Sequence, residues 1–166
     1  MKNHTKTLTT LAIAVSLAMI LSYIEFLLPP IFSAVPGIKL GLANIVVIFL
    51  LYRMNTACAL GVSFVRVCLS ALLFGTALTF AYSLAGAVLS FFAMLLLKKC
   101  RLFSTVGVSI AGGVMHNLGQ ILMAAVLLGT REIIYYMAVL AVTGTLAGVL
   151  VGLVSALVIK RVPEIK

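Results

Sequence analysis

Acidic residues are scarce in this sequence of 166 residues, which contains no aspartate and only three glutamates: Glu25, Glu132 and Glu164. These glutamates lie far apart in the sequence, whereas magnesium-dependent chemistry on diphosphates needs clustered carboxylates. The three cysteines are scattered and show no metal-ligand spacing. The chain also lacks the glycine-rich loop followed by Lys-Ser/Thr that holds nucleotide phosphates. The sequence therefore predicts no catalytic residue, no metal ligand and no cofactor.

Charge of either sign is also scarce, because only 9% of the residues are charged while 64% are hydrophobic. A soluble domain has about a quarter of its residues charged. An α-helix of about 20 apolar residues spans the roughly 30 Å hydrocarbon core of a bilayer, so 166 residues can hold six spans. The composition predicts an all-α integral membrane protein, a single domain over residues 1–166. Helices are expected at residues 8–28, 39–52, 56–74, 78–97, 105–128 and 133–159.

The basic residues predict the orientation of these spans, since cytoplasmic flanks carry the excess of Lys and Arg. With the N-terminus inside, the cytoplasmic side holds Lys2, Lys6, Arg53, Lys98, Lys99, Arg101, Lys160, Arg161 and Lys166. The outside holds only Lys39 and Arg131, and Arg66 lies within a span. The sequence thus predicts a six-helix bundle with both termini cytoplasmic. The net charge of +9 reflects this topology and not binding to nucleic acid.

A polar insertion interrupts the fifth hydrophobic run at residues 112–120. His116, Asn117 and Gln120 fall within an arc of about 100° on one helix face, and Gly113 projects into the same arc. Buried polar groups in a membrane usually face the protein interior, a cavity or a ligand. The glycine leaves room on this face for something other than a side chain.

Polar residues on other helices are expected at a similar depth in the outer half of the membrane. Asn44, Arg66 and Gln120 lie about 7–12 Å below the predicted outer helix ends, given a rise of about 1.5 Å per residue. Glu25 and Tyr82 also fall in the outer third, and Lys39 lies at the outer mouth. This agreement in depth predicts a binding pocket that opens towards the outside.

Two interpretations of these residues are open. Hydrogen bonds between helices would explain the His-Asn-Gln set without a ligand, at about 0.6–2 kcal/mol per bond. Arg66 costs at least about 2.5–3.5 kcal/mol in the membrane, so it needs a carboxylate, several carbonyls or an anionic ligand. If Glu25 neutralises Arg66, the pair is structural; otherwise Arg66 is an anion-binding group. Lys39 is either a snorkelling interfacial lysine or part of the pocket mouth.

Small residues predict close helix contacts at two places. Ala14 and Ala18 give the first helix a small-xxx-small face, which allows close approach of a helix of this chain or of a partner. In the sixth helix small residues recur every four positions, at Gly144, Gly148, Gly152 and Ala156.

Residues 36–45, PGIKLGLANI, and residues 112–120, GGVMHNLGQ, resemble the Gx transporter family, which is also called heptaprenyl diphosphate synthase component I. The resemblance spans nearly the whole chain. That family in turn looks like the substrate-binding S components of energy-coupling factor (ECF) transporters. It implies a bacterial cytoplasmic membrane protein with six helices and an outward pocket roofed in part by residues 29–38. It also implies docking onto a transmembrane T subunit driven by two ATPases, with Ala14 and Ala18 at the docking face.

The resulting hypothesis is a substrate-binding membrane subunit that binds a small anionic metabolite and catalyses nothing itself. Its expected ligand-binding residues are Glu25, Lys39, Asn44, Arg66, Tyr82, Gly113, His116, Asn117 and Gln120. The alternatives are an accessory membrane component of isoprenoid synthesis, a stand-alone carrier and a structural scaffold. The scarcity of carboxylates argues against prenyl diphosphate synthase activity in this chain alone.

Overall fold

The computed structural model describes residues 2–28, 39–129 and 135–163, and all regular secondary structure in these ranges is helical. The elements are α1 (Lys2–Leu27), α2 (Asn44–Arg53), α3 (Thr56–Phe74), α4 (Ala77–Cys100), α5 (Thr105–Leu128) and α6 (Met137–Arg161). All except α2 are long and apolar enough to cross a membrane. The prediction of an all-α, multi-pass membrane bundle is confirmed.

Two helices, α3 and α5, begin and end at the predicted residues because local capping signals set their first turns. The Asn55 side chain accepts a hydrogen bond from the Cys58 amide at 2.8 Å, and Ser104 accepts from the Gly107 amide at 3.2 Å. Other boundaries differ from prediction. Helix α1 begins at Lys2 rather than residue 8, and α4 continues to Cys100 rather than residue 97. The predicted start of the last helix, residue 133, lies outside the described residues.

The second helix was predicted wrongly, because the expected helix 39–52 begins only at Asn44. Gly41 has a φ of +84°, a left-handed conformation that cannot belong to a right-handed α-helix. The remaining ten residues rise about 15 Å, which is half the thickness of the hydrocarbon core. The described chain therefore has five helices of spanning length and a short helix preceded by non-helical residues 39–43.

Replacing Gly41 with alanine is expected to destabilise the protein, since L-residues pay about 1–2 kcal/mol in the left-handed region. The new Cβ would also lie 3.1 Å from the Asn44 side chain and 3.3 Å from the His116 ring. Gly129 provides a matched control, with a φ of +66° and no neighbouring atom within 4 Å of an added Cβ. Chemical unfolding in detergent should show a larger loss for Gly41→Ala than for Gly129→Ala. Equal losses would mean that the packing around Gly41 is loose.

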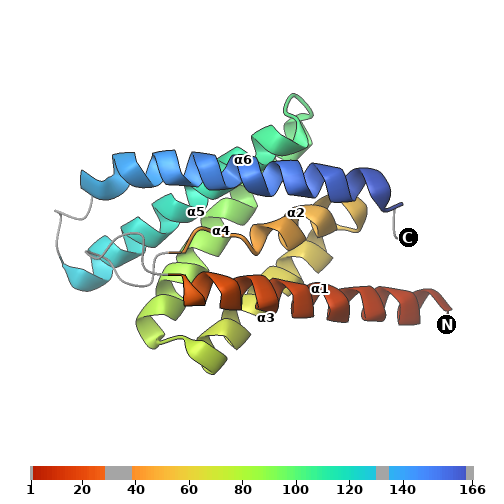
Figure 1. Cartoon of the computed structure of the whole chain (residues 1–166), viewed down its shortest axis with the longest axis horizontal. Helices are drawn as coiled ribbons and strands as arrows, with labels where there is room; N and C mark the ends of the chain where they lie inside the picture. The colour runs from red at the N-terminus through yellow and green to blue at the C-terminus, as the bar shows by residue number, and fades with distance from the viewer. Residues whose placement is uncertain (1, 29–38, 130–134, 164–166) are drawn as a thin grey trace.

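The bundle is organised around α5, which packs extensively against both α4 and α6, and around α2, which lies inside the bundle (Figure 1). Helix α2 contacts α1, α3, α5 and α6. Its side chains Ile48, Leu50 and Leu51 are completely buried and form the centre of the main apolar core. A helix of half length is tolerated here because protein surrounds it instead of lipid.

Glycines bring α5 and α6 into backbone contact, which confirms the predicted close packing along the small-residue face of α6. A Cβ on Gly148 would lie 2.6 Å from the Ile110 Cα. A Cβ on Gly113 would lie 2.4 Å from the Gly144 carbonyl oxygen. The space beside Gly113 is therefore filled by the backbone of α6, and the prediction that it leaves room for a ligand is wrong for this structure.

Ala14 and Ala18, which were expected at a partner-docking face, are buried within this chain. Ala14 is 6% exposed and Ala18 is fully buried, and both belong to the core cluster around α2. The small-xxx-small face of α1 therefore serves packing within this chain. The outward side of α1 carries large apolar residues such as Ile13, Leu17 and Ile20.

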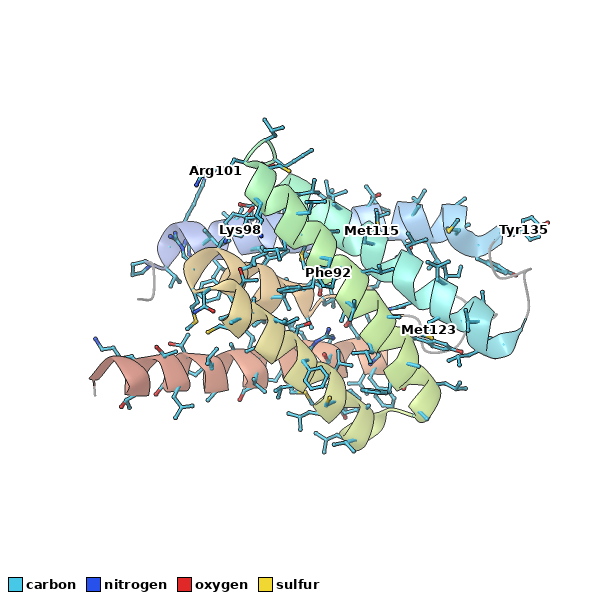
Figure 2. The ribbon with its side chains drawn as sticks, turned by 180° about the vertical axis from the view of Figure 1, so that it is seen from behind. Phe92, Lys98, Arg101, Met115, Met123 and Tyr135 are labelled. Atoms are coloured by element: carbon cyan, nitrogen blue, oxygen red, sulfur yellow. The ribbon has the colours of Figure 1, made fainter. Side chains whose placement is uncertain are left out.

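The ends of the bundle agree with the predicted topology. The first turn of α1 and the last turn of α6 lie at the same end (Figure 1). Lys98 and Arg101 lie at one end of the molecule and Tyr135 at the other (Figure 2). At the basic end the Arg53 side chain donates to the Ile159 carbonyl, and Lys98 donates to the Leu51 carbonyl. These cations stabilise the carboxyl ends of α6 and α2, where carbonyls lack helical partners.

Large apolar side chains cover the outer surfaces of the helices. Phe92 and Met115, which are labelled in Figure 2, are 63% and 37% exposed, and Leu72 is 81% exposed. Such exposure over several sides of one bundle is expected where lipid is the surrounding solvent. The exposed surface is therefore consistent with direct contact with the bilayer.

Candidate functional site

The predicted polar residues meet around the non-helical segment formed by residues 39–43. Gln120 of α5 binds the backbone of Lys39 at two points. The Lys39 amide donates to Gln120 Oε1 at 2.9 Å, and Gln120 Nε2 donates to the Lys39 carbonyl at 3.3 Å. Gln120 is completely buried, so these bonds satisfy polar groups that water does not reach.

His116 lies one turn before Gln120 and joins the same network. Its Nε2 lies 2.6 Å from Gln120 Nε2, which is an amide nitrogen and therefore a donor. His116 Nε2 must accept this hydrogen bond, so the imidazole is neutral and carries its proton on Nδ1. Nδ1 faces the backbone of α4 at Gly86, where an added Cβ would lie 3.0 Å from it.

Glu25 of α1 contacts the same non-helical segment at Leu42. Its Oε1 accepts a hydrogen bond from the Leu42 amide at 2.8 Å. Non-helical backbone within a membrane protein must find such partners inside the protein. Glu25 and Gln120 together therefore stabilise the break in the chain before α2.

Asn44 is the first residue of α2 and directly follows the 39–43 segment. Its Nδ2 donates to Ser90 Oγ of α4 at 3.3 Å. An added Cβ on Gly41 would touch both the Asn44 side chain and the His116 ring, so these two groups lie against the same glycine. The amide of Asn44 thus links α2 to α4 at the level of the network.

Arg66 is a buried charged group with few partners among the described residues. It is 2% exposed, and its only hydrogen bond to a described residue runs from Nη1 to Ser22 Oγ at the long distance of 3.5 Å. Nε and Nη2 have no hydrogen-bond partner among the described residues. Within the described part of the chain no ion pair of 4.0 Å or less joins Arg66 to Glu25.

Glu25, Lys39 and Arg66 nevertheless form one electrostatic group. Burial removes water from all three, and each lies near enough to the other two for their charges to interact. The Lys39 ammonium also lies 5.8 Å from the centre of the Phe74 ring, a cation–π contact near the end of α3. Two cations and one anion give this group a formal charge of +1.

Three of the predicted ligand-binding residues lie apart from this network. Asn117 Nδ2 donates to the Leu140 carbonyl of α6 at 2.9 Å, so its amide joins α5 to α6. Tyr82 is buried in an apolar cluster with Ile121 and Leu140. Gly113 packs against α6. Residues 116, 117 and 120 share one broad arc of α5, and this arc is divided between α6 and the 39–43 segment.

Ser22 and Ser90 are two contacts that the sequence prediction missed. Ser22 is the hydroxyl beside Arg66, and Ser90 is the acceptor for Asn44. Ser22 precedes Glu25 by three residues, so the helical period places both on one face of α1. That spacing could have identified Ser22, whereas nothing in the sequence marks Ser90 as facing α2.

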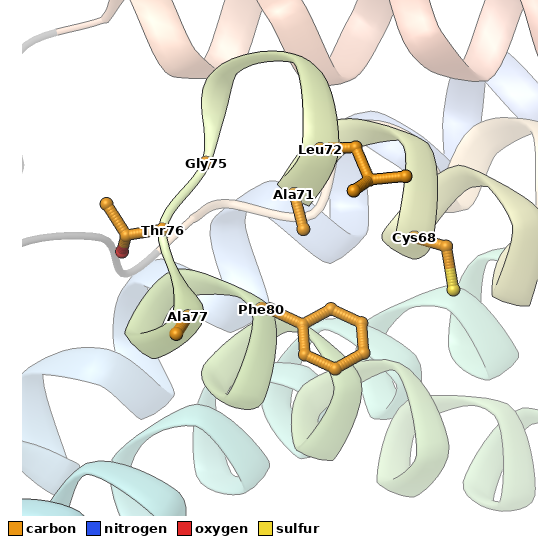
Figure 3. Close-up of a pocket in the computed structure, with 7 residues that line it drawn as sticks. All are labelled: Cys68, Ala71, Leu72, Gly75, Thr76, Ala77 and Phe80. Carbon is orange, nitrogen blue, oxygen red and sulfur yellow. The ribbon is translucent and has the colours of Figure 1, made fainter.

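An open apolar cavity of about 420 Å³ lies near the turn between α3 and α4 (Figure 3). Cys68 and Leu72 of α3, Phe80 of α4 and the intervening turn contribute to its lining. Cys68 and Leu72 lie roughly on the opposite face of α3 from Arg66. The cavity is therefore separate from the polar network. No group of His, Cys, Asp or Glu able to hold a metal ion occurs in the part of the chain that the structure describes.

Replacing Gln120 with leucine is expected to release the backbone of Lys39. Each lost hydrogen bond contributes about 0.5–1.5 kcal/mol, so amide exchange at residue 39 should become roughly tenfold to a hundredfold faster. Hydrogen–deuterium exchange of the peptide covering residues 39–43 measures this change. Asn117→Leu is the matched control, because Asn117 bonds α6 and should leave exchange at Lys39 unaltered. Unchanged exchange in Gln120→Leu would contradict the two-point contact.

A comparison of the sequence with known protein families finds a match. The family of heptaprenyl diphosphate synthase component I matches residues 14–158. The chain belongs to this family. The match begins within α1, ends within α6 and includes Glu25, Arg66 and Gln120. Searches of the curated proteins and of the solved structures found no match. The predicted family is therefore confirmed.

Proposed function

We propose that this member of the family is a substrate-binding membrane subunit, similar to the S components of ECF transporters, and that Arg66 binds an anionic metabolite. The observation that carries the proposal is the buried guanidinium with Nε and Nη2 unpartnered among the described residues. Charged groups inside a membrane protein are usually paired, and those that remain are candidates for ligand binding.

The other polar side chains of the network each make a hydrogen bond at normal distance, although Glu25 Oε2 and His116 Nδ1 are also unpartnered among the described residues. Glu25 and Gln120 stabilise the 39–43 segment, His116 supports Gln120, and Asn44 binds α4. Breaking or omitting one partner of a buried charge costs about 3–5 kcal/mol. Within residues 2–28, 39–129 and 135–163 Arg66 has no such role beyond its long contact with Ser22, and in this proposal an anionic ligand supplies the missing compensation.

In this proposal the chain binds substrate and partner subunits supply energy. It has no nucleotide-binding loop, so ATP hydrolysis takes place on two cytoplasmic ATPases linked through a transmembrane T subunit. The protein lies in the bacterial cytoplasmic membrane. Because Ala14 and Ala18 are buried, the T subunit contacts other residues of this chain.

A second candidate function is an accessory membrane component of heptaprenyl diphosphate synthesis, which the name of the family favours. In that case a separate subunit carries out the condensation, because this chain has three glutamates and no aspartate with which to hold magnesium. The chain itself is not an enzyme under either candidate function.

Affinity purification of the full chain from its own membranes separates the two candidates. The transport proposal expects a second membrane protein and two ATPases to co-purify, with ATPase activity that responds to this subunit. Recovery of a soluble prenyl synthase subunit, and prenyl diphosphate elongation with magnesium by that complex, would favour the accessory role and contradict the transport proposal. Elongation by the purified chain alone would contradict both.

A further inference from the structure

We infer that the ligand of Arg66 is a monocarboxylate, which binds through both carboxylate oxygens to the guanidinium edge formed by Nε and Nη2. This inference rests on the proposed function, because it specifies the ligand of the same site. The proposed function leaves open whether the anion is a carboxylate, a phosphate or a diphosphate. This inference selects a single carboxylate.

The free edge of Arg66 has the shape that a carboxylate matches. The guanidinium is planar, and its N–H groups project in a fixed fork. Nη1 is the nitrogen held by Ser22, while Nε and Nη2, which are adjacent on the other edge, are unpartnered among the described residues. Two parallel N–H donors on one edge pair with two oxygens of a carboxylate or of a phosphate, so the fork selects an oxyanion and the local charge selects between the two.

The charges around Arg66 favour a ligand with a single negative charge. In their ionised forms Glu25, Lys39 and Arg66 sum to +1, and Glu25 follows Ser22, the contact of Arg66, by about one turn of α1. A phosphate monoester carries about −1.5 to −2 near neutral pH, and a diphosphate carries more. The Glu25 carboxylate, kept in place by the Leu42 amide, would repel this additional charge. One carboxylate neutralises the group and leaves no excess.

Formate and inorganic phosphate are suitable probes, since both are small enough to enter without a specific substrate body. The purified full chain in nanodiscs is titrated with each anion at constant ionic strength and pH 7.5. The Arg66 Nε–H resonance is followed by NMR, and its assignment comes from the Arg66→Lys spectrum. We expect a saturable shift with formate and at least tenfold weaker binding of phosphate. No saturable shift with formate, or equal or tighter binding of phosphate, would overturn the inference.

Two variants test the two parts of this inference. One changes the shape of the cation at position 66, and the other changes the net charge around it. Arg66→Lys keeps the charge but loses the fork, so carboxylate binding should weaken about tenfold or more. Arg101→Lys, at an exposed turn, is the matched control and should bind formate as wild type does. Glu25→Gln keeps an oxygen for the Leu42 amide but raises the local charge to +2, and should improve phosphate binding relative to formate. Unchanged formate binding in Arg66→Lys, or an unchanged preference in Glu25→Gln, would contradict the inference.

The outcome for the ligand class is separate from that for the proposed function. A natural ligand recovered with the wild-type protein and carrying phosphate, but no carboxylate, would overturn the inference while the binding function stands. Saturable formate binding at Arg66 in a protein that never retains a metabolite and never joins an ATPase would support the fork geometry and contradict the transport function.

Discussion

Arg66→Met is expected to abolish ligand binding while the protein remains folded. Removing one partner from a buried charge pair costs about 2–5 kcal/mol of binding free energy, which is roughly a 30-fold to several-thousand-fold loss of affinity. In the ligand-free state the same change removes a buried guanidinium that makes one long hydrogen bond to the described part of the chain. An arginine near the centre of a span costs about 2.5–3.5 kcal/mol on insertion scales, so the ligand-free variant should be at least as stable as wild type.

Thermal unfolding of both ligand-free proteins in the same detergent measures the stability part of this prediction, and equilibrium dialysis with metabolite extracts measures binding. Arg101→Met is the matched control, because Arg101 is exposed and lies at the turn between α4 and α5. It should change neither property appreciably. A large loss of stability in Arg66→Met would show that the guanidinium has structural partners in the fold, and wild-type affinity in that variant would remove Arg66 from the binding site.

Gly113→Val is expected to produce the largest loss of stability, because even the first added carbon has no room. The Cβ alone would lie 2.4 Å from the Gly144 carbonyl oxygen and 3.2 Å from the Gly148 Cα. Both obstacles are backbone atoms, so relief requires α5 and α6 to move apart. Overpacking a well-packed core usually costs about 1–3 kcal/mol, and separation of two helices should bring the loss to the top of that range or beyond.

Gly61→Val supplies the matched control for this substitution. Gly61 also lies within a long helix, but an added Cβ there meets no atom within 4 Å. The free energy of unfolding of Gly61→Val should change by less than about 1 kcal/mol, because valine is a somewhat better helix former than glycine. Reversible unfolding in mixed micelles gives both free energies. Similar losses for the two variants would contradict the close backbone contact between α5 and α6.

The sequence predicts much of the fold because its strongest signals are local. Long apolar runs identify the five long helices, and capping residues such as Asn55 and Ser104 set the starts of α3 and α5. The start of α2 could not be located from hydrophobicity, since residues 40–43, Leu-Gly-Leu-Ala, continue its apolar run. Its actual start depends on the left-handed conformation of Gly41 and on hydrogen bonds from distant helices.

Membrane depth predicted which of several polar residues lie near one another, but not what each one contacts. Common depth grouped Glu25, Asn44 and Gln120, which meet around the 39–43 segment, but it also included Tyr82, which lies in an apolar cluster. A helix period shows which residues share a face, yet it does not show which neighbouring helix covers that face. Asn117 and Gly113 face α6 for this reason. The backbone contacts of Glu25 and Gln120 depend on a non-helical segment whose path no periodic pattern records.

Native mass spectrometry of wild type and Arg66→Met, purified in parallel from the same cells, tests the central claim most directly. The account predicts that the wild-type protein carries a small acidic molecule and that Arg66→Met, with an unchanged unfolding temperature or a higher one, carries none. The same molecule on both proteins at equal occupancy, or an unoccupied wild-type protein whose Arg66 signals do not respond to added anions, would contradict it.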